Sequence, residues 1–168
     1  MLVKKDIEEL NNNVFNLIGK EWMLITAGNS QSLNTMTASW GGLGVLWNKN
    51  VATIYIRPQR HTLNFIQKHD IYTLCFFDKA HKDILRFCGA KSGKTTDKIA
   101  ATGLEPFETE NKGIAFKQSK LVIECKKIYT DQIREENILD TSIAKSIYQA
   151  KDFHFIFIGE ILSCLAEN

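Results

Sequence analysis

The sequence predicts a single domain over residues 1–168, of the α+β class but mainly β, built around a barrel of about six antiparallel strands. Strand-like segments recur through the centre and the end of the chain, and only short helical patterns lie between them. The 168 residues, 44% of them hydrophobic and 24% charged, suit one globular core. A closed barrel is favoured over an open sheet because it leaves no unpaired strand edges.

The first half of the chain contains three predicted strands. Segments 21–28 and 51–57 are rich in apolar and β-branched residues, and 34–40 alternates between hydroxyl-bearing and apolar side chains. Glycines after 34–40 are expected to interrupt the sheet before a short apolar segment at 45–47 and a turn over 48–50. A proline directly after 51–57 ends the third strand, because proline cannot donate to the ladder.

Helices and a buried strand are predicted next. A helix begins near Thr62, whose hydroxyl is expected to serve as the N-cap. Segment 71–77 is apolar on both faces, which is typical of a central strand covered on each side. Two more short helices are predicted: one over 80–88 with Asp78 as its cap, and one over 96–102 that ends at a left-handed glycine.

The last part of the chain returns to strands. Segments 114–118 and 120–129 are strand-like, and the alternation of the second slips at 127–128, which predicts a bulge. A helix over 142–149 precedes a strand over 153–165. Both faces of this last strand are apolar, so one meets the core and the other requires cover from a helix or a second subunit.

The composition points to a soluble protein of the cytoplasm. Lysine and arginine total 21 against 19 aspartate and glutamate, which argues against a strongly basic nucleic-acid binder. No apolar run approaches a membrane span, and acidic residues occupy the N-terminal stretch where a signal peptide would be apolar. Four widely spaced cysteines suit buried positions in a reducing compartment: Cys75, Cys88, Cys125 and Cys164. Neither these cysteines nor the four histidines have the spacing of a metal site.

Positive charge is concentrated in two segments. Residues 22–69 contain four lysines and arginines and no acidic residue, and residues 79–98 contain six against two aspartates. Each segment therefore carries a local charge of +4, although the whole chain carries only +2. The pattern favours an anionic ligand, although a solvated basic surface would look the same.

Two local patterns strengthen the case for a ligand. Thr35, Thr37 and Ser39 are expected to project from one face of their strand, where three neutral donors would suit phosphate or ring oxygens. A threonine face turned to water is the alternative. Arg60 lies at the predicted N-terminus of the helix that begins near Thr62, where the helix dipole and free N–H groups favour a phosphate. Arg60 is accordingly the strongest candidate for binding the anion.

The sequence lacks the motifs of several enzyme classes. Segment 89–95 resembles a Walker A loop, but it is one residue too short and follows a helical pattern. There is no dinucleotide-binding glycine motif, no nucleophile elbow and no carboxylate pair suited to glycoside hydrolysis. No side chain is therefore assigned as a catalytic group or a metal ligand. A cationic, aromatic pocket without such groups is what a protein needs when a bound cofactor carries the reactivity.

Three segments together resemble one known family. Residues 34–44 (NTMTASWGGLG), 57–62 (RPQRHT) and 87–104 (FCGAKSGKTTDKIAATGL) are similar to the flavin reductase-like FMN-binding split-barrel family, particularly its flavoredoxin-like members. The resemblance extends over residues 15–165. It implies a six-stranded antiparallel Greek-key split β-barrel with short peripheral helices, and a homodimer that binds FMN near the subunit interface.

The resemblance also implies which residues hold the cofactor. The flavin ring and ribityl chain would follow one strand through backbone and hydroxyl contacts of Thr35, Met36, Thr37, Ala38 and Ser39. Trp40 would either stack near the ring or belong to the core. The phosphate end would be held by Arg60, His61 and Thr62, with Arg57 as a weaker candidate. A loop would close over the cofactor with Ser92, Gly93 and Lys94, and Lys98 would lie nearby.

The function that the resemblance implies is electron transfer through FMN. A nicotinamide, NADH or NADPH, would deliver a hydride to FMN, and the electrons would pass to a small-molecule or protein acceptor. Two alternatives remain open: an FMN-binding electron carrier without its own NAD(P)H activity, and a non-catalytic barrel that binds another small molecule. The residues decide neither the preferred nicotinamide nor the acceptor.

Overall fold

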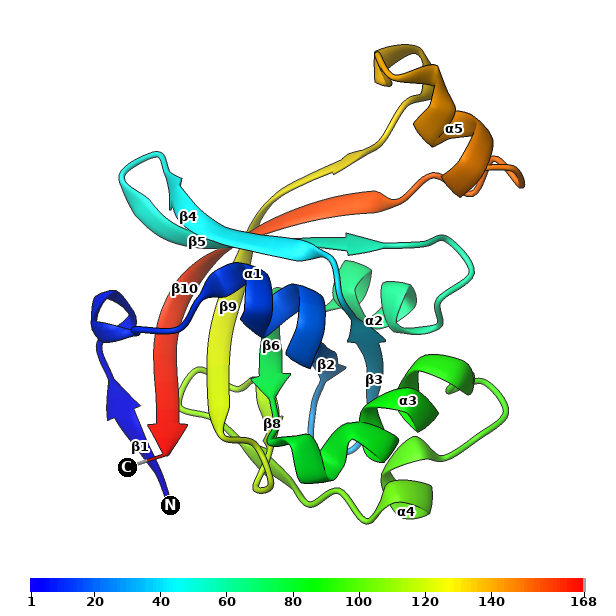
Figure 1. Ribbon diagram of the computed structural model, residues 1–168. Coiled ribbons are helices and arrows are strands. Elements are labelled where there is room, and N and C mark those ends of the chain that lie inside the picture. The colour runs from blue at the N-terminus through cyan, green and yellow to red at the C-terminus, as the bar shows by residue number, and fades with distance from the viewer. Residues whose placement is uncertain (168) are drawn as a thin grey trace.

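One antiparallel sheet organises the protein (Figure 1). The computed structural model describes residues 1–167, and its main sheet has the order β3-β2-β6-β9-β10-β5-β4, with β1 pairing beside β10. The strands of this sheet are β1 (Leu2–Lys5), β2 (Met23–Gly28), β3 (Leu33–Ala38), β4 (Gly41–Leu46), β5 (Lys49–Ile56), β6 (Ile71–Phe76), β9 (Leu121–Gln132) and β10 (Phe155–Glu167). A separate two-stranded sheet joins β7 (Pro106–Glu108) to β8 (Ile114–Phe116). The protein is therefore mainly β and antiparallel, as the sequence predicts.

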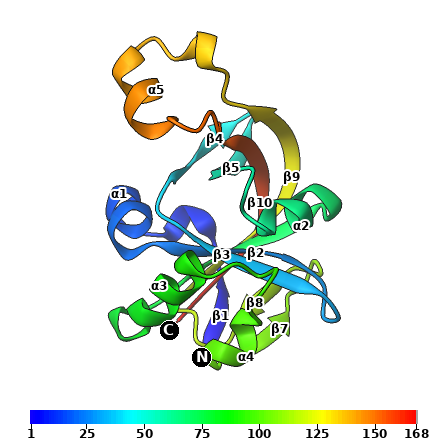
Figure 2. The same cartoon turned by 90° about the vertical axis from the view of Figure 1, so that its right-hand side faces the viewer.

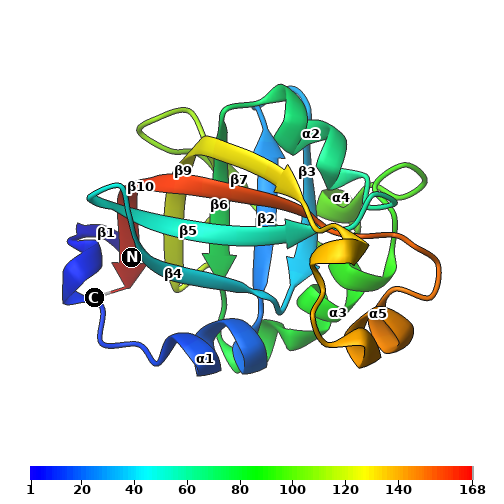
Figure 3. The same cartoon turned by 90° about the horizontal axis from the view of Figure 1, so that it is seen from above.

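The sheet is curved but not closed into a ring. Seen from above, β4, β5 and the start of β10 cross the direction of β2, β3 and β6 (Figure 3). The terminal strands β3 and β4 do not pair with each other anywhere in residues 1–167. The expected closed ring of six strands is thus corrected to a curved sheet of eight. Helix α3 (Lys82–Ala90) packs along β3 and protects this edge without adding a strand.

The long strands β9 and β10 connect the two halves of the sheet through a bulge. Gly159 of β10 pairs with Lys127 and the residue before it pairs with Tyr129, so Ile128 is the extra residue. The bulge predicted from the slip in alternation is therefore confirmed. A side chain at Gly159 would overlap the ring of Tyr72, so the bend requires glycine.

Short helices surround the sheet. The remaining ones are η1 (Ile7–Glu9), α1 (Val14–Asn16), η2 (Leu17–Glu21), α2 (Thr62–Lys68), η3 (Lys79–His81), α4 (Lys98–Thr102), η4 (Glu135–Asn137) and α5 (Thr141–Ile147). Asp97 accepts from two N–H groups at the start of α4, and Gly103 ends this helix with a φ of 67°, as predicted. In residues 1–167, no helix has the length and apolar character needed to cross a bilayer.

Three local predictions are wrong. Thr62 is the first residue of α2 rather than its N-cap, and its hydroxyl accepts a hydrogen bond from Asn34 instead. Asp78 precedes η3 and makes no capping hydrogen bond with its side chain. The glycines expected to interrupt the sheet belong to β4, and the turn lies at Trp47 and Asn48, with φ of 53° and 56°. Positive φ at both positions is the geometry of the type I′ turn, one of the two turns that two-residue hairpins favour.

The core has two parts on opposite faces of β6. Tyr72, Leu74 and Phe76 join the larger cluster inside the curve of the sheet, whereas Cys75 joins the smaller cluster next to α3. β6 is thus covered on both faces, as the apolar residues on its two faces predict. All four cysteines are free and buried, as expected.

A buried carboxylate attaches the β7–β8 hairpin to the main sheet. Glu124 of β9 is fully buried and accepts hydrogen bonds from Asn111 Nδ2 (2.8 Å), Gly113 N (3.0 Å), Ser163 Oγ (2.9 Å) and the Thr109 hydroxyl. Burial raises the pKa of this carboxyl, but the hydrogen bonds outweigh burial and the pKa lies below its ordinary value. The ionised form therefore stabilises the fold.

Glu124→Gln is expected to lower the free energy of unfolding by about 1–3 kcal/mol at pH 7, because the amide NH₂ would face hydrogen-bond donors. Since the folded-state pKa is lowered, the stabilisation is complete above the ordinary pKa of glutamate and is lost as the pH falls through the folded-state value. The difference between the two proteins should therefore shrink below about pH 4. Urea unfolding across this pH range measures the effect.

Glu110→Gln is the matched control for this experiment. Glu110 lies in the same hairpin, but its carboxylate forms an exposed ion pair with Lys4 (2.7 Å). Its loss should change stability by less than about 1 kcal/mol. Equal destabilisation by the two substitutions at pH 7 would contradict the role assigned to Glu124.

Candidate functional site

Arg60 lies in the connection between β5 and α2, close to the end of α3. Pro58 follows β5, Arg60 N donates to Arg57 O (3.1 Å) to form a turn, and α2 begins directly afterwards. The Arg60 side chain donates from Nη1 to Gly89 O (2.8 Å). Its other terminal nitrogen, Nη2, is buried and has no hydrogen-bond partner in residues 1–167. Burial also lowers the pKa of Arg60.

Lys98 is a buried cation beside Arg60, whose own side chain is half-buried. Lys98 is 5% exposed, and its Nζ donates to Thr35 O (2.7 Å) and Cys88 O (2.9 Å). Burial, and then the charge of Arg60, lower the pKa of Lys98 to about 8. Across the described part of the chain, neither cation forms a salt bridge with a carboxylate. A buried lysine beside a half-buried arginine, neither of them paired with a carboxylate in the described residues, favours an anion at this place.

Part of this arrangement is structural. Cys88 and Gly89 lie in the last turn of α3, where unpaired carbonyl groups and the helix dipole attract cations. Lys98 directs both of its hydrogen bonds to backbone carbonyls, whereas Arg60 keeps one buried donor free. A helix cap would use all of its buried donors, so the unpartnered Nη2 of Arg60 indicates a ligand site.

A polar cavity of about 500 Å³ lies along the first half of β3, with walls from residues 31–35 and 93–99. Asn34 Nδ2 donates to Thr62 Oγ (2.8 Å), which joins β3 to the start of α2. A Cβ added at Gly93 would lie 2.8 Å from Asn34 Cγ, which is closer than real Cβ atoms approach. Glycine at this position therefore allows the 93–99 segment to pack against β3.

The loop after α3 brings further positive charge to this cavity. Ser92 Oγ accepts from Lys94 N (3.3 Å) within the loop. Burial, followed by the charges of Lys94 and Lys98, lowers the pKa of His61. The structure thus gathers Arg60, His61, Lys94 and Lys98 from the two basic segments, as the charge pattern suggests.

The three hydroxyls expected to face a ligand do not act alike. Thr35 Oγ is buried and hydrogen-bonded to Thr26 Oγ (2.9 Å), and Thr37 Oγ donates to Leu85 O of α3. Only Ser39 of the three keeps its hydroxyl free of such bonds in residues 1–167. The expectation that all three hydroxyls face a ligand is therefore corrected, because those of Thr35 and Thr37 bind β2 and α3 instead. The outer edge of β3, with no strand beside it in residues 1–167, presents backbone groups instead.

Residues 133–153, which we call the arm, project from the sheet between β9 and β10 (Figures 1 and 2). Arg57 anchors this segment: it forms an ion pair with Asp152 and donates from Nη2 to Ile147 O (3.1 Å). Because an adjacent carboxylate balances its charge, Arg57 remains a weaker candidate than Arg60 for binding a phosphate.

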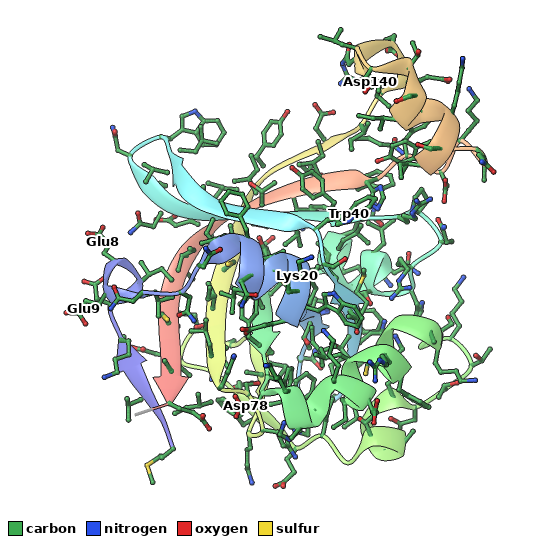
Figure 4. The ribbon with its side chains drawn as sticks, viewed as in Figure 1. Glu8, Glu9, Lys20, Trp40, Asp78 and Asp140 are labelled. Atoms are coloured by element: carbon green, nitrogen blue, oxygen red, sulfur yellow. The ribbon has the colours of Figure 1, made fainter. Side chains whose placement is uncertain are left out.

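A second cavity, of about 230 Å³, follows the end of β3 toward Trp40. It is lined by Met36, Thr37, Ala38, Ser39, Trp40, Tyr55, Arg57, Arg60 and His154. Trp40 is 46% exposed and its ring centroid lies 5.1 Å from that of His154, so Trp40 forms a wall rather than part of the core. Figure 4 shows Trp40 between η2, which carries Lys20, and the arm, which carries Asp140.

His154 is buried at the base of the arm. Tyr148 Oη lies 2.8 Å from His154 Nδ1. Burial, and then the charge of Arg57, lower the pKa of His154 to about 4. The imidazole is therefore neutral at pH 7, and it adds hydrogen-bonding capacity to the cavity without adding charge.

The residues of these cavities and their supports that sequence reasoning missed include Asn34, Tyr55, Tyr148 and His154. His154 carries a weak signal, since it is a polar residue at the start of a strongly apolar strand. The other three carry none, because their roles depend on contacts between segments that are distant in the sequence.

Comparison with known families matches residues 15–168 to the flavin reductase like domain. A comparison with curated proteins finds no match. Among solved structures, flavoredoxin from Methanosarcina acetivorans is 21% identical, with a TM-score of 0.71 over 98% of this chain and 76% of that chain. An FMN-binding protein from Thermus thermophilus is 16% identical, with a TM-score of 0.71 over 100% and 83%. A putative flavin reductase with a split barrel domain from Shewanella frigidimarina is 19% identical, with a TM-score of 0.69 over 96% and 77%.

These structural similarities show that the curved sheet has the split-barrel fold. Because the family match extends from residue 15 to residue 168, the chain belongs to the family of flavin reductase-like domains.

Proposed function

We propose that this protein binds FMN and passes electrons from NADH or NADPH through it to an acceptor. The observation that carries the proposal is the buried, unpartnered Nη2 of Arg60, described within residues 1–167, beside the buried charge of Lys98. A phosphate group would accept from Arg60 and balance both charges. Membership of the flavin reductase-like family supports a flavin as the carrier of this phosphate, and the FMN-binding relative supports FMN.

The two cavities suit the two ends of FMN. The polar cavity offers Lys94 and Lys98, with Arg60 close by, to a phosphate. The cavity toward Trp40 offers Met36 and an aromatic wall to a flavin ring. Because β3 runs along both cavities, its backbone would follow the ribityl chain from one end to the other.

FMN, when bound, supplies the redox chemistry: it accepts a hydride from the nicotinamide and passes electrons on. The chain binds and orients the reactants. Arg60 and Lys98 would hold the phosphate, and the backbone of 36–39 would orient the ring. Trp40 and His154 would shield the ring from water. A neutral His154 would do so without placing a charge beside the flavin.

A homodimer in the cytoplasm is part of the proposal. Ile158 of β10 lies between Thr53 of β5 and Tyr129 of β9, on the face opposite the core residue Phe157. Tyr129 is 40% exposed, and the ring of Trp47 lies 6.3 Å from it. Such an apolar face supports contact with a second subunit, and sedimentation equilibrium should give twice the mass of one chain.

The proposed location in the cytoplasm is supported by the cysteines, because free, buried cysteines suit a reducing compartment.

Absorbance spectroscopy tests the proposal. Purified protein that has been incubated with FMN and freed of excess cofactor should be yellow, and anaerobic NADH or NADPH should bleach the visible flavin absorbance. A protein that stays colourless would contradict FMN binding. A yellow protein whose flavin stays oxidised would instead be an electron carrier without NAD(P)H activity.

Arg60→Ala should weaken FMN binding by about 1.5–3 kcal/mol, roughly 10- to 150-fold in Kd, because a charge-assisted hydrogen bond is lost. Titration of flavin fluorescence measures this. Arg86→Ala is the matched control, since Arg86 is exposed on α3 and pairs with Asp83 (2.7 Å); its Kd should equal that of the wild type. An unchanged Kd in Arg60→Ala would place the phosphate elsewhere.

The affinity for FMN should fall as the pH rises from about 7 to about 9. A phosphate dianion favours protonated Lys98, whose pKa in the free protein is about 8. Below this value the lysine already carries its proton; above it, binding requires proton uptake, and Kd should rise by up to about tenfold per pH unit. Lys98→Met should bind more weakly and lose this dependence. A wild-type Kd that stays constant over the range would contradict the role of Lys98.

A further inference from the structure

A third cavity, of about 770 Å³, adjoins the cavity beside Trp40. The two cavities share Ser39, Trp40 and Tyr55 in their walls. The other walls of the third cavity come from the helical segment 14–19, from the start of β4 and from the arm. Three parts of the chain that are distant in sequence therefore enclose it. We call this cavity the aromatic groove.

No charged side chain from residues 1–167 lines the aromatic groove. The chain as a whole is 24% charged, and the polar cavity at the other end of β3 contains Lys94 and Lys98. A charged group that entered the groove would lose hydration and gain no counter-ion, which is unfavourable. The groove therefore selects a neutral molecule.

Flat surfaces form the walls of the groove. They come from four aromatic residues and two glycines: Phe15, Trp40, Tyr55, Tyr148, Gly41 and Gly42. Phe15 is 88% exposed and Trp40 is 46% exposed. Exposed apolar surface gathered around one cavity indicates a binding site. Aromatic side chains bind planar molecules by stacking, and glycines leave the strand flat beneath them.

We propose that the aromatic groove binds neutral planar molecules of the quinone class as electron acceptors. Binding in the groove rests on the groove's own residues, whereas the electron-transfer step rests on the proposed function. In that step, reduced FMN gives up two electrons and two protons and returns to its oxidised form, and the quinone takes them up and becomes a hydroquinone. The shared wall of Ser39, Trp40 and Tyr55 would place the acceptor next to the flavin ring.

Two probes of nearly the same shape test the requirement for a neutral ligand. Anthraquinone-2-sulfonamide is neutral and anthraquinone-2-sulfonate is an anion. Binding of each probe is measured by quenching of tryptophan fluorescence and by calorimetry, with the protein both free of FMN and loaded with FMN. The sulfonamide should bind saturably in both cases, and the sulfonate at least about tenfold more weakly.

Phe15→Lys places a cation in the groove at a position that is 88% exposed, so the core is not disturbed. It should weaken binding of the sulfonamide by about tenfold and reduce the discrimination against the sulfonate. Leu139→Lys is the matched control, because Leu139 is 95% exposed and lies outside the groove. This control should keep the wild-type affinity for both probes.

Equal affinity of the wild type for the two probes, or no saturable binding of either, would overturn the proposal. If in addition Phe15→Lys turned a dimer into a monomer in sedimentation, a second copy of the chain would be the occupant of the groove. Normal binding of the sulfonamide by a protein that fails to bind FMN would contradict the proposed function and still support the groove as a quinone site.

Discussion

The placement of two cations at the end of α3, Lys98 buried and Arg60 half-buried, is the constraint on which the arrangement of the site depends. Arg60 and Lys98 hold the last carbonyls of this helix, and Lys98 also holds β3 through Thr35 O. Burying cations is unfavourable, but here it secures a helix against a strand edge that would otherwise expose unpaired backbone groups. The same interactions that protect the edge leave a positive charge beside it. Protection of the sheet and attraction of an anion thus have one physical origin.

Periodicity predicted most of the larger strands, and of the three smallest it predicted β8 but not β1 or β7. β6 has apolar residues on both faces and β10 is long, and both were predictable from their residues. β1 and β7 have four and three residues and are partly exposed, so no alternation distinguishes them from loops. β1 forms because β10 extends beyond the end of β5 and offers it a free edge. Thr62 was predicted to cap α2, but its hydroxyl bonds instead to Asn34, a partner that is distant in the sequence.

The sequence predicted the positively charged residues of the site better than it predicted the hydrogen bonds and burial that depend on contacts between distant segments. Arg60 and Lys98 come together as the basic segments suggest. The alternation of Thr35 and Thr37 in β3 is also real, but packing against β2 and α3 determines what their hydroxyls bind. His154 illustrates the limit, since its neutral state follows from burial beneath the arm, which no local pattern encodes.

The arm can vary in length without disturbing the sheet. Its two ends are fixed, because Gln132 of β9 pairs with Phe155 of β10. Residues can therefore be inserted or deleted between these positions without shifting the register of the sheet. Ile133 and Tyr148 from this segment line the aromatic groove, whereas Arg60 and Lys98 lie on other segments. Changes in the length of this one connection would thus reshape the aromatic groove while Arg60 and Lys98 stay in place.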